Sequence, residues 1–204
     1  MSRRIGSIQL DLPKSWHWIP QVGRAGDRWA AEMAERLLPE PLRDEDALAV
    51  LAEQLGDVYS NVEESGAPDA WTAVCAPPPA YVLLSGMIMF QASSTASLDS
   101  YSMALAEWTN AENSGEVRSA DPIDEVLPAG RVKGAHVILN RPVVAPSGIV
   151  EQVLEERVVL ALEPPGCDNV LEIVCIAASL GSFKDMTRDM LELLRPLVVL
   201  TKEG

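Results

Sequence analysis

Residues 149–177 read IVEQVLEERVVLALEPPGCDNVLEIVCIA, and this stretch decides the fold class. Periodicity alone leaves its first half ambiguous, because Ile149, Val153 and Leu160 also match one face of a helix. The β-branched content of 149–162 and the Pro-Pro-Gly turn at 164–166 favour a strand. Residues 170–177 (VLEIVCIA) indicate a second strand. The sequence therefore predicts a long β-hairpin over 149–177.

Further strands and helices are predicted on the N-terminal side of this hairpin and after it. Strands are expected at 7–12, closed by Pro13, and at 70–75, 81–90 and 131–139. A helix opens after Ser93-Ser94-Thr95 and ends by 113–115, and a last helix is capped by Ser182. Hairpin-connected strands with grouped helices predict an α+β fold, a mainly antiparallel β-sheet flanked by helices in an α/β/α sandwich.

Residues 24–66 look like a helical segment inserted between strands. Asp27 can cap a first helix, Pro39 and Pro41 break it, and a second helix begins near Asp44 with acidic residues in its first turn. A chain of 204 residues fits one large domain. We therefore expect a single domain over 1–204 that carries an insertion at about 24–66.

Charge and cysteine content narrow the function classes. The net charge of −14 argues against nucleic-acid binding, which depends on clustered Lys and Arg. The longest apolar run, 80–90, is too short for a bilayer span of about 20 residues. Arg3 and Arg4 are not followed by an apolar signal-peptide region. With Cys75 and Cys175 predicted to be buried thiols, these features favour a cytoplasmic protein without a membrane span.

Four features of the chain resemble the PsbP-like superfamily, which includes photosystem PsbP, Ran-binding import factors, LpqN-type lipoproteins and bacterial effector chaperones. They are an early strand that runs into Leu12-Pro13 with Trp16 shortly after, Ser97 to Tyr101 opening a helix, the late hairpin, and a closing helix with Phe183 and Met186. The resemblance covers about three quarters of the chain and excludes 24–66. It implies protein binding without a shared catalytic apparatus. The protein-binding role that we expect is that of a bacterial protein.

No motif indicates catalysis or a bound cofactor. The sequence has no G-x-S-x-G, P-loop, G-x-G-x-x-G or H-E-x-x-H pattern, and no Cys-x-x-Cys pair for zinc. His136 lies in an apolar strand, where a structural histidine is expected. Glu151, Glu155 and Glu156 suggest a pair of catalytic carboxylates, but a solvated strand surface explains them more simply. We expect no enzyme activity, no cofactor and no metal.

Trp16-His17-Trp18 raises the question of a contact surface. Trp near a strand end usually covers the core, and the second interpretation is an exposed hot spot. The interface candidates are Trp16, Trp18, Trp29 and Met33. We expect a non-catalytic protein-binding module, an adaptor or secretion chaperone whose partner is another protein, with a homodimer left open. The alternatives are an immunity protein that binds a basic toxin, a structural subunit of an assembly, and a hydrolase with an unrecognised site.

Overall fold

The computed structural model describes residues 3–20, 26–64, 70–77, 84–95, 97–110, 116–144 and 148–203. The chain forms two compact units, one of residues 1–11 with 92–204 and one of residues 12–91. The predicted α+β class with mainly antiparallel strands and flanking helices is confirmed. The prediction of a single domain with an insertion stays a prediction.

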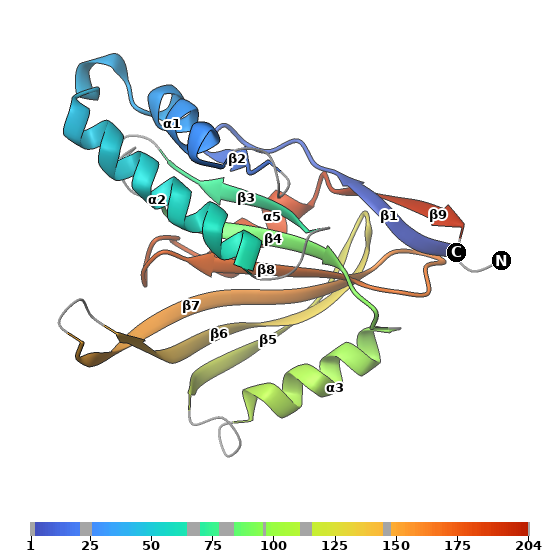
Figure 1. The fold of residues 1–204 in the computed structure, drawn as a ribbon. Helices are drawn as coiled ribbons and strands as arrows, with labels where there is room; N and C mark the ends of the chain where they lie inside the picture. The colour runs from blue at the N-terminus through green and yellow to red at the C-terminus, as the bar shows by residue number, and fades with distance from the viewer. Residues whose placement is uncertain are drawn as a thin grey trace. The chain divides into compact units, whose positions relative to one another are not determined.

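The unit of residues 12–91 packs two helices on three antiparallel strands (Figure 1). Its elements are β2 (Trp16–Trp18), α1 (Gly26–Leu37), the 3-10 helix η1 (Glu40–Leu42), α2 (Glu45–Glu64), β3 (Trp71–Cys75) and β4 (Gly86–Ala92). Trp16 pairs with Cys75, and Ala73 pairs with Ile88. The helical character predicted for 24–66 is thus confirmed for its described residues.

The core of this unit lies between the helix pair and the strands. Leu51, Leu55 and Tyr59 recur on one face of α2 and are buried with Val74 of β3. Leu38 joins the same cluster from the α1 side. The apolar periodicity of 3 to 4 residues in α2 therefore marks the face that packs.

In its described residues, the unit of residues 1–11 with 92–204 contains four neighbouring antiparallel strands, a separate strand pair and two helices. Its elements are β1 (Arg3–Gln9), α3 (Leu98–Thr109), β5 (Val117–Leu127), β6 (Gly130–Val144), β7 (Val150–Glu163), β8 (Leu171–Ala177), α5 (Met186–Leu194) and β9 (Val198–Glu203). The hairpin predicted over 149–177 is confirmed as β7 and β8, with Leu160 paired to Ile173. β1 pairs antiparallel with β9.

Helix α3 covers one face of β5, β6 and β7. Leu105 packs against Ala135, Val137 and Val159, which share that face because residues two apart in a strand point the same way. Ser97 caps the helix, since its hydroxyl accepts a hydrogen bond from the Ser100 backbone N–H at 3.2 Å. The tight turn from β5 to β6 uses Gly130 at φ 149°.

Several predicted boundaries are wrong. The first strand ends at Gln9 and not at Leu12. The last helix begins at Met186 with Asp185 as its cap, while Ser182 closes a turn with Ser179. Strands β5 and β9 were not predicted. Part of the strand predicted at 81–90 lies outside the described residues.

Candidate protein-binding surface

Several exposed apolar side chains of the unit of residues 1–11 with 92–204 lie on an arm that β6 and β7 form beyond their neighbouring strands. β5 pairs with β6 only as far as Leu139, and β8 pairs with β7 only from Arg157 onward. Residues 140–144 and 150–156 therefore continue as a two-stranded ribbon, called the arm below. Figure 1 shows the arm extending to the left, past the ends of β5 and β8.

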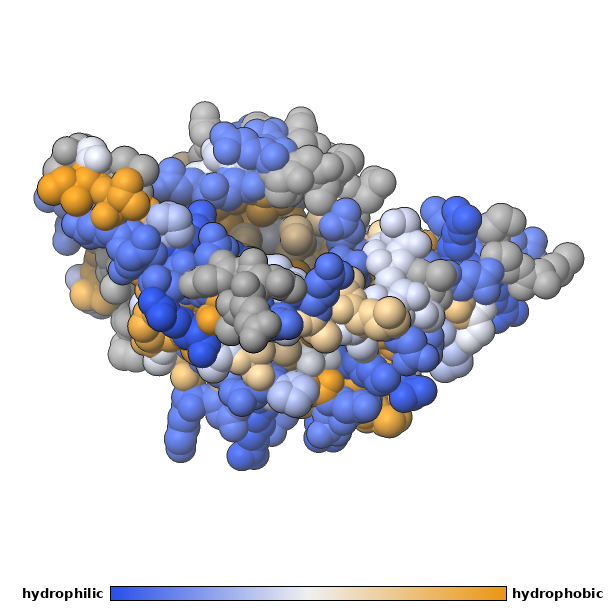
Figure 2. Space-filling view, turned by 90° about the horizontal axis from the view of Figure 1, so that it is seen from below, coloured by the Kyte–Doolittle hydropathy of each residue, from blue (hydrophilic) through white to orange (hydrophobic). Residues whose placement is uncertain are grey.

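The arm exposes large apolar side chains. Val150 is 59 % exposed, and Val143, Val153 and Leu154 each expose more than two fifths of their surface. Ile149, next to the arm, is exposed as well. Figure 2 shows hydrophobic side chains gathered at the left edge of the view. The arm lies on this same side in Figure 1. Single exposed apolar residues are common, but a cluster of this kind indicates an interaction surface.

Both faces of the arm contribute to this cluster. Val150 and Leu154 share one face, where Leu154 is paired with Asn140, whereas Val153, which is paired with Arg141, lies on the other. A strand with one buried face would alternate apolar and polar residues. Neither face of the arm is buried, so its apolar residues do not belong to the core.

An ion-pair cluster fixes the base of the arm. Glu155 accepts hydrogen bonds from Arg157 Nε and from Arg141 Nη1, the latter at 2.9 Å. Burial raises the pKa of the Glu155 carboxyl, but the hydrogen bonds and charges of Arg157 and Arg141 lower it by more. The pKa of Glu155 therefore lies below its ordinary value, and the carboxylate holds both strands in register.

A surface cavity of about 360 Å³ adjoins this cluster. Arg141 and Arg157 line it together with the partly exposed Trp108 at the end of α3. Arginine and tryptophan are enriched in protein interfaces, since both combine apolar area with hydrogen-bond donors. The arm and this cavity thus form one continuous candidate surface.

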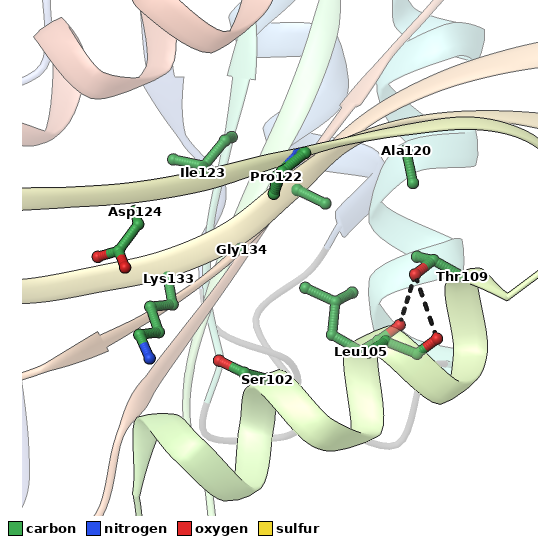
Figure 3. Close-up of a pocket in the computed structure, with 11 residues that line it drawn as sticks. Ser102, Leu105, Thr109, Ala120, Pro122, Ile123, Asp124, Lys133 and Gly134 are labelled. Carbon is green, nitrogen blue, oxygen red and sulfur yellow. Dashed lines mark hydrogen bonds between the residues drawn. The ribbon is translucent and has the colours of Figure 1, made fainter.

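A second cavity, of about 280 Å³, runs between α3 and the strands β5 and β6. Figure 3 shows Leu105 and Lys133 reaching into the space between helix and strands. The hydroxyls of Ser102 and Thr109 bond to carbonyls of their own helix, at 2.7 Å from Leu98 O and 2.9 Å from Leu105 O. The polar groups on the helix side are thereby satisfied, which leaves a groove suited to an apolar side chain.

His136 and Glu156 meet on the face of the sheet opposite Ala135 and Val137. His136 Nε2 lies 2.9 Å from Glu156 Oε1, and the Gly181 backbone N–H donates to Glu156 Oε2 at 3.4 Å. Both carboxylate oxygens are therefore engaged. This arrangement anchors the loop after β8 to the sheet, which agrees with the structural histidine predicted from sequence.

His17 occupies β2, where its surroundings lower the pKa of its imidazole. Partial burial lowers the pKa of the imidazole, and the positive charge of Arg36 lowers it further. Its Nε2 is buried and has no hydrogen-bond partner among the residues described. Within the same ranges, no three His, Cys, Asp or Glu side chains are placed to share a metal ion.

The four predicted interface residues all lie in the other unit, and they divide by burial. Trp16 and Met33 are buried, so neither side chain is free to contact a partner in this conformation. Trp18 is 37 % exposed and packs its ring 5.9 Å from that of Phe90. Trp29 is half-buried, 6.2 Å from Tyr59.

Sequence reasoning missed the arm residues Val143, Val150, Val153 and Leu154. A signal was present, because apolar positions 150, 153 and 154 break the strict alternation of a half-buried strand.

No protein-family model matches the chain, and no curated protein matches it either. None of the described helices combines the length and the apolar character that crossing a membrane requires.

Proposed function

We propose that the chain is a non-catalytic protein-binding module, an adaptor or secretion chaperone of the bacterial cytoplasm, that engages its partner through the arm. The observation that carries this proposal is the cluster of exposed Val143, Val150, Val153 and Leu154 beyond the sheet. Exposed valine and leucine cost solubility unless a partner covers them. The resemblance to the PsbP-like superfamily supports the same role and remains part of the proposal.

The base of the arm supplies the polar contacts that such a surface needs. Trp108, Arg141 and Arg157 border a cavity next to the apolar cluster, and an apolar centre beside anchored arginines is typical of interface hot spots. Because Glu155 already orients both guanidinium groups, little side-chain entropy is lost when a partner binds them.

Three alternatives remain. The net charge of −14 suits an immunity protein that neutralises a basic toxin. The hydrogen bond between His136 and Glu156 is the observation that favours a hydrolase, but both carboxylate oxygens are occupied, which favours a structural role. A structural subunit would bury the arm permanently against another chain.

The proposal is tested by quantitative affinity purification from the native host. The double variant Val153→Ser/Leu154→Ser removes apolar area from the arm, and Met103→Ser on the exposed side of α3 is the matched control. We expect the double variant to lose one dominant partner that wild type and the control retain, with all three proteins equally stable. Equal recovery of partners by all three would refute the proposal.

A further inference from the structure

We propose that residues 150–156 of β7 are a docking edge for an extended, basic segment of a partner protein, which adds to the arm as a third strand. This inference rests on the proposed function, because it specifies how the arm binds and what chemistry the partner presents.

Among the described residues, no strand pairs with the side of 150–156 that faces away from β6. These residues pair with 138–144 of β6, while β8 reaches β7 only at Arg157. Successive N–H and C=O pairs of an antiparallel strand alternate between its two sides, so about half of them face away from β6. Unpaired groups of this kind are a template for an added strand.

The two edges of the arm differ in how open they are. On the β6 edge, Pro142 has no N–H to donate, and proline protects an edge strand for that reason. The β7 edge reads VEQVLEE and contains neither proline nor glycine. Val150, Val153 and Leu154 along it are exposed and offer apolar contacts to a neighbouring strand. We therefore place the docking strand next to β7.

The negative charges of this edge favour a basic partner segment. Residues 150–156 carry three carboxylates and no basic side chain. Glu155 forms ion pairs with Arg141 and Arg157, and Glu156 is hydrogen-bonded to His136 and the Gly181 backbone N–H. Glu151 makes no ion pair with any residue in the described ranges. A basic residue opposite Glu151 would complete the pairing that the arm itself lacks.

A second copy of the chain is a poor occupant for the same reason. Antiparallel pairing of two β7 edges about Val153 sets Glu151 opposite Glu155 of the other copy, and in-register parallel pairing sets each glutamate beside its own counterpart. Like charges directly opposite in a sheet are destabilising. A basic extended segment relieves this repulsion, whereas self-pairing creates it.

The test uses three synthetic peptides with the full-length chain. The first alternates lysine and valine over nine residues, the second replaces each lysine with glutamate, and the third is the first with alternate backbone nitrogens methylated. Anisotropy measures the affinity of each peptide, and amide hydrogen exchange locates the site. We expect the first peptide to slow exchange at 150–156 and to bind at least about tenfold more tightly than the other two.

Charge reversal in the chain provides the second readout. Glu151→Lys is expected to reverse the preference between the lysine and glutamate peptides, while Glu125→Lys, the same change on exposed β5, leaves it as in wild type. Equal binding of the methylated peptide, slowed exchange elsewhere, or self-association of the chain through 150–156 would overturn the proposal. If arm variants lose a native partner but no peptide protects 150–156, the proposed function stands and the docking edge fails. If arm variants lose no partner, the proposed function itself fails.

Discussion

Gly134 is a residue at which the structure predicts a sharp loss of stability on substitution. It lies in the middle of β6, opposite Leu160 of β7. A Cβ atom added there would lie 2.1 Å from the Val159 carbonyl oxygen and 2.8 Å from the Leu160 Cα. Both obstacles are backbone atoms, so no side-chain rotation relieves the overlap, and the two strands must separate by about 1 Å to restore van der Waals contact.

The expected cost of Gly134→Ala follows from this separation. It weakens about two ladder hydrogen bonds, each worth about 1 kcal/mol, and loosens the buried contacts of Val159 and Leu160, which gives a loss of about 2–4 kcal/mol in the free energy of unfolding. Gly56→Ala is the matched control, because the same methyl group in α2 meets nothing within 4 Å.

Urea denaturation, followed by circular dichroism and by hydrogen exchange in each unit, measures both effects. For Gly56→Ala we expect a gain of about 0.5–1 kcal/mol, since alanine favours helix and reduces the entropy of the unfolded chain. The two substitutions thus have opposite signs. A Gly134→Ala protein as stable as wild type would contradict the close approach of β6 and β7 at Gly134.

Three further predictions concern titration and reactivity. Because the pKa of His17 is lowered, the unfolded state binds more protons, and stability should fall as the pH drops below about 6.5; His17→Gln should reduce that slope in urea titrations. Because the pKa of Glu155 is lowered in the folded state, the ionised carboxylate stabilises the fold at pH values above its ordinary pKa of 4.5. This contribution is lost as the pH falls through the lower pKa of the folded state. In acid denaturation, Glu155→Gln should therefore remove it. Cys167 should be the only thiol that a maleimide modifies in the native protein, because Cys75 and Cys175 are buried. The reaction should be slow, because burial and the charge of Asp168 raise the pKa of the Cys167 thiol. Mass spectrometry counts the adducts.

The sequence was informative where apolar periodicity met a strong turn signal. The β7–β8 hairpin was predictable because β-branched residues flank Pro164, Pro165 and Gly166. The sequence does not predict strand β5, because only Val117, Ile123 and Leu127 are buried in its eleven residues and Pro122 lies in its middle. Its position depends on pairing with β6, which is a tertiary effect that no local pattern carries.

The candidate surface was harder to predict than the fold. Tryptophan content suggested Trp16 and Trp18 as contacts, but burial of Trp16 is decided by neighbours distant in sequence. The arm arises because β7 has fourteen residues and β8 has seven, so β7 extends past its partner. The extent to which β7 passes β8 is known only once the register of the two strands is known. The unpaired edge at 150–156 therefore could not be located from the sequence.

The central claim, that the arm receives a partner protein, is tested most directly by photo-crosslinking in the native host. A photoreactive amino acid replaces Leu154 on the arm, or Val126 on β5, which is 75 % exposed and serves as the control. The account predicts one dominant protein adduct from position 154 that is missing from position 126. The same adducts from both positions, or none from 154, would contradict it.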